Sequence, residues 1–100
     1  MYTVVPSNRF RRALRKQSKS GEKHVFAALA EVVDLLVVHD DRSLYVLSTR
    51  WKDHALKGDK KGMRELHLSQ DILLLYDIDE KLHMIKLLDI VSHEELRKKR

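Results

Sequence analysis

The spacing of hydrophobic positions changes along the chain from a helical period to an alternating one. A short apolar run at 2–5 predicts a strand that Pro6 ends, and Ser7 or Asn8 can cap a helix that begins there. In that helix and in a second one over residues 22–38, apolar side chains recur at intervals of three and four residues. A short polar link separates the two helices, which predicts an antiparallel pair.

The second half of the chain carries the pattern of β-strands. Residues 64–68 alternate between apolar and polar positions, with Glu65 and His67 on the side opposite the leucines. Residues 72–78 are almost continuously apolar, and 82–91 return as a long strand. Helices followed by an antiparallel meander predict an α+β fold, in which a helical hairpin packs on a small antiparallel sheet.

Other segments have weaker or more local signals. Residues 39–43 are typical of a turn, residues 44–47 could be extended, and the chain up to residue 62 resembles a basic loop. Near the C-terminus, Ser92 and Glu95 are spaced as a capping box, which predicts a short last helix.

Length and composition limit the class of protein. With 100 residues, 43% of them hydrophobic and 35% charged, we expect one domain over residues 1–100 with a basic tail at 97–100. The chain has no cysteine and shows no secretory signal, and its apolar runs are far shorter than the ~20 residues of a membrane helix. These features predict a cytoplasmic protein without a membrane partner.

The net charge of +5 is unevenly distributed. Residues 1–24 carry seven basic residues and one acidic residue, and residues 50–64 carry six basic and two acidic ones. Segregated cations favour a polyanionic partner such as a nucleic acid, although a solvated basic surface is the simpler interpretation.

Three histidines near the second basic segment are candidates for chemistry. His54, His67 and His93 stand at the ends of predicted elements, and Asp71 follows His67 across a tight turn. Antiparallel pairing can bring these four side chains to one edge of the sheet. Because imidazole exchanges protons near neutral pH, the set is suited to acid–base catalysis. A metal site built from the same residues remains an alternative without a local signature.

The basic segment adds residues that can hold phosphates. These are Lys52, Lys57, Lys60, Lys61 and Arg64, and Trp51 beside them could stack on a base. Their spacing matches neither a Walker loop nor a dinucleotide fingerprint, so no nucleotide cofactor is expected.

Four segments, in this order, resemble the YafQ-like toxins of the RelE/ParE superfamily of bacterial toxin–antitoxin modules. They are DHALKG at 53–58, KGMRELH at 61–67, DILLLY at 71–76 and SHEEL at 92–96.

The resemblance implies a RelE-like fold and a ribosome-dependent mRNA endonuclease without a metal or cofactor. In such enzymes the ribose 2′-hydroxyl attacks the adjacent phosphate while a base and an acid move the protons. The family's functional residues fall on His54, His67, Asp71 and His93, with the roles of base and acid left open. The resemblance also implies a cognate antitoxin of the DinJ/RelB kind, and operator DNA would be bound only through that antitoxin.

Two positions depart from the family pattern. Ile72 stands where the family often has tryptophan, and Asp89 stands where an arginine usually stabilises the phosphate. Lys86 or Arg64 could supply the missing cation. Two other interpretations remain open: a weakly active or non-nuclease member that binds its target, as the gyrase-directed branch does, and a plain nucleic-acid-binding module.

Overall fold

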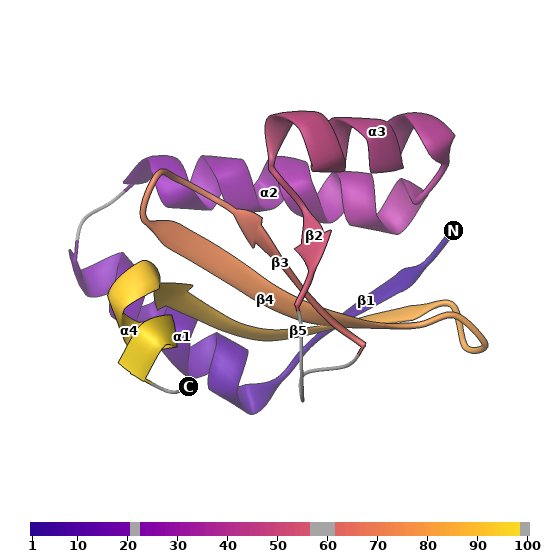
Figure 1. The fold of residues 1–100 in the computed structure, drawn as a ribbon. Helices are drawn as coiled ribbons and strands as arrows, with labels where there is room; N and C mark the ends of the chain where they lie inside the picture. The colour runs from indigo at the N-terminus through magenta and orange to yellow at the C-terminus, as the bar shows by residue number, and fades with distance from the viewer. Residues whose placement is uncertain (21–22, 57–61, 99–100) are drawn as a thin grey trace.

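The computed structural model describes residues 1–20, 23–56 and 62–98. In these residues, helices lie against one mixed β-sheet (Figure 1). The strands are β1 (Thr3–Pro6), β2 (His54–Ala55), β3 (Met63–His67), β4 (Ile72–Asp79) and β5 (Met84–Ser92). The helices are α1 (Asn8–Ser20), α2 (Lys23–Val38), α3 (Asp41–Arg50) and α4 (His93–Lys98). The predicted α+β class is confirmed.

The strands follow the order β1-β5-β4-β3-β2 across the sheet. The antiparallel meander predicted for the second half of the chain is formed by β3, β4 and β5. The N-terminal strand β1 adds to this meander in parallel with β5, so the sheet is mixed. Segments from the two ends of the sequence therefore lie side by side (Figure 1).

Short-range signals place several helix ends. The amide of Phe10 donates to Ser7 Oγ at 3.0 Å, so Ser7 caps α1. At α4, the amide of Glu95 donates to Ser92 Oγ at 3.1 Å, and the amide of Ser92 donates to a carboxylate oxygen of Glu95 at 3.3 Å. The predicted capping box is therefore confirmed.

The expectation of an extended segment at 44–47 is wrong, because α3 runs through it. Asp40 caps this helix: its side chain accepts a hydrogen bond from the amide of Ser43 at 2.8 Å. Ser43 and Leu47, one helical turn apart, are the buried residues of α3. The apolar run at 44–47 gave no sign of this cap, and packing against α2 selects the helix.

The sheet has two different faces. The larger apolar cluster joins one face to α1, α2 and α3, and includes Phe10, Leu29, Leu36, Leu47 and Leu74. The smaller cluster, on the other side of β4, consists of Leu73, Leu75, Val91 and Leu96, the last from α4. Because residues of a strand alternate between faces, β4 is buried on both sides, as its sequence predicts.

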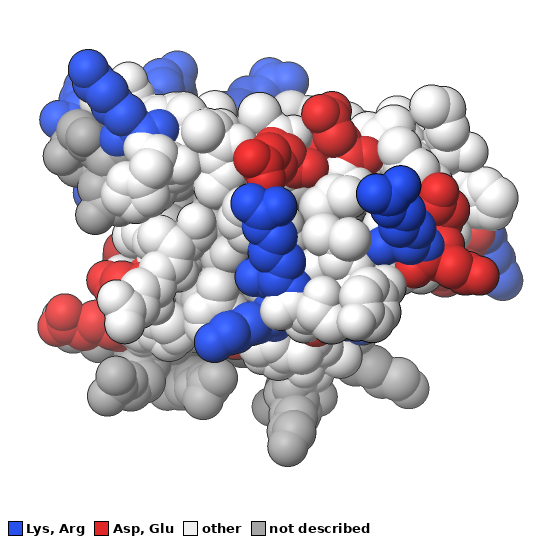
Figure 2. Space-filling view, turned by 90° about the horizontal axis from the view of Figure 1, so that it is seen from above, with Lys and Arg blue, Asp and Glu red and all other residues white. Residues whose placement is uncertain are grey.

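The outer surface of α2 and α3 is mixed in charge. Figure 2, which views the molecule from above, shows Lys and Arg close to Asp and Glu on this side. For example, Nη2 of Arg50 in α3 lies 3.6 Å from Oε2 of Glu31 in α2. None of the helices in the described residues combines the length and the apolar character needed to cross a bilayer.

Candidate active site

Strand pairing positions the candidate histidines on the sheet face that α1–α3 leave uncovered. His54 of β2 pairs with Glu65 of β3, and His67 lies two residues further along β3, on the same side. His93 follows β5 directly, and its amide donates to the carbonyl of Asp71 at 3.2 Å. Residues far apart in the sequence are thus brought to one edge of the sheet.

The three imidazoles form a row with His67 in the middle. Ring centroids of His54 and His67 are 6.4 Å apart, and those of His67 and His93 are 5.3 Å apart. A single phosphodiester group can contact side chains at such separations. The side chains of His54 and His93 are about half exposed, at 50% and 40%, so the row is open to a macromolecular substrate.

His54 is held by acceptors at both ring nitrogens. Its Nε2 lies 2.8 Å from Oε1 of Glu65, and its Nδ1 lies 2.8 Å from the carbonyl oxygen of Lys52. A carbonyl and an ionised carboxylate only accept hydrogen bonds, so this arrangement is satisfied when both nitrogens carry protons. Lys52 has φ of 55°, and this left-handed turn places its carbonyl next to the ring. These two contacts fix the orientation of the ring.

His67 has the opposite electrostatic environment. Burial and the neighbouring His93 lower its pKa below the usual 6.5, with smaller contributions from Lys52 and His54, while Glu65 opposes the shift. The neutral ring is therefore favoured at neutral pH. A neutral imidazole is the form that accepts a proton.

His93 has a carboxylate partner. Its Nδ1 lies 3.5 Å from Oδ1 of Asp71, whose side chain is 70% exposed. His93 is the first residue of α4. Asp71 also orients the ring, because it holds Nδ1 and leaves Nε2 for another partner.

Glu65 is a site residue that was not singled out from the sequence. It is only 7% exposed, and Oε2 of its carboxylate has no hydrogen-bond partner among the described residues. Glu65 lies two residues before His67 in the alternating pattern of this strand, and this spacing could have placed it on the same face as His67. Its role depends on burial between β2 and β4, which the sequence pattern does not give.

Arg64 is engaged away from the histidine row. Its Nε and Nη2 donate to the carboxylate of Asp53, Nη2 at 3.1 Å, and the hydroxyl of Tyr76 donates to the same carboxylate. Burial opposes charge on Arg64, but the hydrogen bond and charge of Asp53 raise its pKa overall. This network fixes the residue preceding His54 to β3 and β4.

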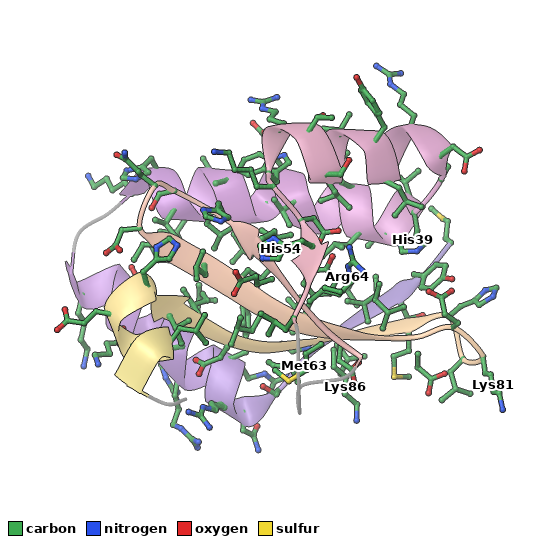
Figure 3. All side chains as sticks on the ribbon, viewed as in Figure 1. His39, His54, Met63, Arg64, Lys81 and Lys86 are labelled. Atoms are coloured by element: carbon green, nitrogen blue, oxygen red, sulfur yellow. The ribbon has the colours of Figure 1, made fainter. Side chains whose placement is uncertain are left out.

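The other predicted phosphate contacts are dispersed. Lys52 lines a groove next to His67. Lys86 is exposed on β5, and Figure 3 shows it near Met63 and away from His54. The predictions for Lys57, Lys60 and Lys61 lie outside the described residues. Trp51, considered as a base-stacking residue, is only 9% exposed and is covered by Arg50, whose Cζ is 5.4 Å from the ring centroid.

The two departures from the family pattern have clear places in the structure. Ile72 is 8% exposed and belongs to the larger core. Asp89 is 8% exposed, and Arg9 of α1 donates from Nε to its Oδ2 at 3.0 Å. The negative charge that replaces the expected arginine is therefore matched by a cation from another element.

The described residues contain no group of three or more His, Cys, Asp or Glu side chains arranged to hold a metal ion. The histidine row is an array of proton donors and acceptors with differing environments. A small α+β domain that exposes such a row defines a candidate acid–base site for an anionic substrate.

Comparison with known proteins gives the family. The family model for YafQ, the bacterial toxin of type II toxin–antitoxin systems, matches residues 2–98. This chain therefore belongs to the YafQ toxin family. A metal-bound toxin from Helicobacter pylori is 34% identical, with a TM-score of 0.80 over 96% of this chain and 99% of that one.

More distant structures share the fold. YafQ from Escherichia coli strain BL21(DE3) is 21% identical with a TM-score of 0.78, over 96% of this chain and 98% of that one. The E. coli DinJ–YafQ complex gives 22% identity and a TM-score of 0.77 over the same shares. Among curated proteins, no sequence matches this chain.

Proposed function

We propose that this toxin is a ribosome-dependent mRNA endoribonuclease that cuts the RNA backbone by acid–base catalysis. The observation that carries the proposal is the row formed by His54, His67 and His93, with ring centroids 6.4 and 5.3 Å apart and three different environments. Groups whose surroundings separate their protonation states can take the roles of acid and base.

His67 is the general base in this mechanism. Its lowered pKa keeps the ring neutral, so it can take the proton of the ribose 2′-hydroxyl. The 2′-oxygen then bonds to the adjacent phosphorus, and the bond from phosphorus to the 5′-oxygen breaks. The products are a 2′,3′-cyclic phosphate and a 5′-hydroxyl.

His93 is the general acid, and His54 supplies positive charge. Asp71 lies at Nδ1 of His93 and leaves Nε2 to give a proton to the leaving 5′-oxygen. His54, whose ring is positioned by Glu65, stabilises in its protonated form the charge that grows on the phosphate oxygens. Arg9 neutralises Asp89, so that carboxylate repels the substrate less.

The second part of the proposal concerns the partner. The E. coli relative was solved as a complex of DinJ and YafQ. We infer that this chain likewise has a cognate antitoxin, that the antitoxin covers the histidine row, and that operator DNA is bound through it.

Expression of the chain in bacteria, with mapping of mRNA 5′ ends on translating ribosomes, tests the nuclease. We expect growth arrest and new 5′ ends within open reading frames. His67→Ala and His93→Ala should abolish both, while His24→Ala, at an exposed position on α2, should not. Full toxicity of folded His67→Ala and His93→Ala variants would contradict the assignment.

The second candidate is a toxin that binds a target without cutting RNA. It is favoured by Asp89, because this chain has a carboxylate where a phosphate-stabilising cation is expected. The same experiment separates the two functions: growth arrest with intact mRNA on ribosomes would select binding.

A further inference from the structure

A groove of about 360 Å³ opens directly beside the middle histidine of the row. Its polar lining comes from the segment that joins α3 to β2 and from the turn between β3 and β4. The residues are Arg50, Trp51, Lys52, His67, Ser69 and Gln70. His67 lines this groove, whereas no histidine of the row lines the groove between α2 and α3 or the groove between α1 and β5.

The charge of the groove favours an anionic polymer. Its charged lining residues are Arg50 and Lys52, both exposed. By contrast, the neighbouring groove between α2 and α3 has Glu31, Asp34 and Asp40 in its wall. The lining of the basic groove contributes no carboxylate; Glu31, whose Oε2 lies 3.6 Å from Nη2 of Arg50, lines the neighbouring groove. A nucleotide chain that crosses His67 can therefore continue into the basic groove.

One wall offers a flat cationic surface. The guanidinium of Arg50 lies over the indole of Trp51, with Cζ 5.4 Å from the ring centroid, and the Arg50 side chain remains 67% exposed. Trp51 is itself buried, so the open face of this pair is the guanidinium plane. Arginine planes and aromatic rings are the surfaces on which unstacked RNA bases lie.

Another part of the lining offers a hydrogen-bonding edge on a fixed turn. The amides of Leu68 and Ser69 donate to the carbonyl of Ile72, and the amide of Ile72 donates to Ser69 Oγ at 3.1 Å. Gln70 stands at the tip of this closed turn and is exposed. Its amide has both donors and an acceptor, which can pair with the edge of a base.

We propose that this groove holds the base of the nucleotide next to the bond that is cut, stacked on Arg50 and read by Gln70. The inference rests on the proposed nuclease function and adds the origin of its base preference. His67 acts on the sugar and phosphate, and the groove selects which nucleotide is presented to it.

The test is a map of cleavage sites on mRNA in a reconstituted translation system. Wild type is compared with Arg50→Ala, with Gln70→Ala and with the control Arg42→Ala, which makes the same charge change on α3 outside this groove. Loss of base stacking, worth about 1–3 kcal/mol, should lower cleavage at the preferred sites about 5- to 150-fold in Arg50→Ala. Gln70→Ala should keep cleavage and flatten the base preference at one position, and Arg42→Ala should match wild type.

A binding measurement isolates the groove from catalysis. The chain has one tryptophan, Trp51, so its emission reports on the groove. Fully 2′-O-methylated hexanucleotides of A, C, G and U, which lack the attacking hydroxyl, should change this emission to base-dependent extents. Arg50→Ala should weaken the effect about tenfold or more.

The outcomes separate the two proposals. If wild type cuts mRNA but Arg50→Ala and Gln70→Ala keep its base preference and rate, the groove inference is wrong and the nuclease stands. Emission that is unchanged at oligonucleotide concentrations that saturate binding would also overturn the groove inference. If wild type leaves ribosome-bound mRNA intact, the nuclease itself is refuted.

Discussion

The two faces of the sheet have different roles: one carries most of the apolar core, and the other carries the candidate active site. The face under α1–α3 is a continuous apolar core, and its polar network of Asp53, Arg64 and Tyr76 is internally paired. The other face has a small apolar cluster beside a row of partly exposed histidines. Because each strand presents alternate residues to the two faces, one set of strands can hold a rigid core and an open site at the same time.

The largest expected effects come from one substitution on each face. Leu74 is fully buried under the helices, so Leu74→Ala should cost about 2–5 kcal/mol of the free energy of unfolding. His67→Ala should leave stability within about 1 kcal/mol. The same change should lower cleavage by about 10²–10⁴-fold. Denaturant unfolding and ribosome-bound mRNA cleavage measure the two quantities, and a destabilised but active His67→Ala would break the comparison.

Asp53 tests whether the core face also positions the site. Asp53→Asn leaves the guanidinium of Arg64 without a carboxylate and should cost about 2 kcal/mol in denaturant unfolding. The control Asp34→Asn, at an exposed position on α2, should change stability by less than about 0.5 kcal/mol. Equal effects of the two variants would show that the buried network does not fix β2.

Glu65 should control the charge of its histidine neighbour. Glu65→Gln keeps an acceptor for Nε2 of His54 but removes the negative charge that faces the ring. We expect cleavage to fall about tenfold. NMR of the His54 ring nitrogens gives its protonation state, and an unchanged spectrum in Glu65→Gln would refute this role.

The smallest expected effect is a pH dependence that comes from His67. Its pKa is lowered from 6.5, so the folded chain keeps the ring neutral where the unfolded chain binds a proton. With respect to this group, the folded state is therefore most stable above pH 6.5. Stability is lost as the pH falls from 6.5 through the lower pKa that His67 has in the folded chain. Cleavage should fall on the acid side with a midpoint below pH 6.5, and His67→Ala should remove the stability change in that window.

Local signals carried most of the fold prediction, and non-local contacts account for what it missed. The spacing in α2, the alternation in β3 and the capping box at Ser92 depend on nearby residues, and they were read correctly. Helix α3 depends on packing against α2, and the parallel pairing of β1 with β5 joins segments about 80 residues apart.

In the site, too, local patterns could be predicted and non-local contacts could not. The antiparallel register that gathers the histidines could be predicted from the strand pattern. The ion pair of Arg9 with Asp89 joins α1 to β5, and the burial of Glu65 needs its neighbours on both sides, so neither was visible in the sequence.

The most direct test of the proposed mechanism removes one atom of the substrate, the 2′-oxygen of a single nucleotide. The chain is added to ribosomes that hold an mRNA with a single 2′-deoxynucleotide at the mapped cleavage position. Attack by the 2′-hydroxyl onto the phosphate predicts that this mRNA stays intact there, while the all-ribose mRNA is cut to a 2′,3′-cyclic phosphate and a 5′-hydroxyl. Cleavage of the 2′-deoxy position at the normal rate would contradict the mechanism.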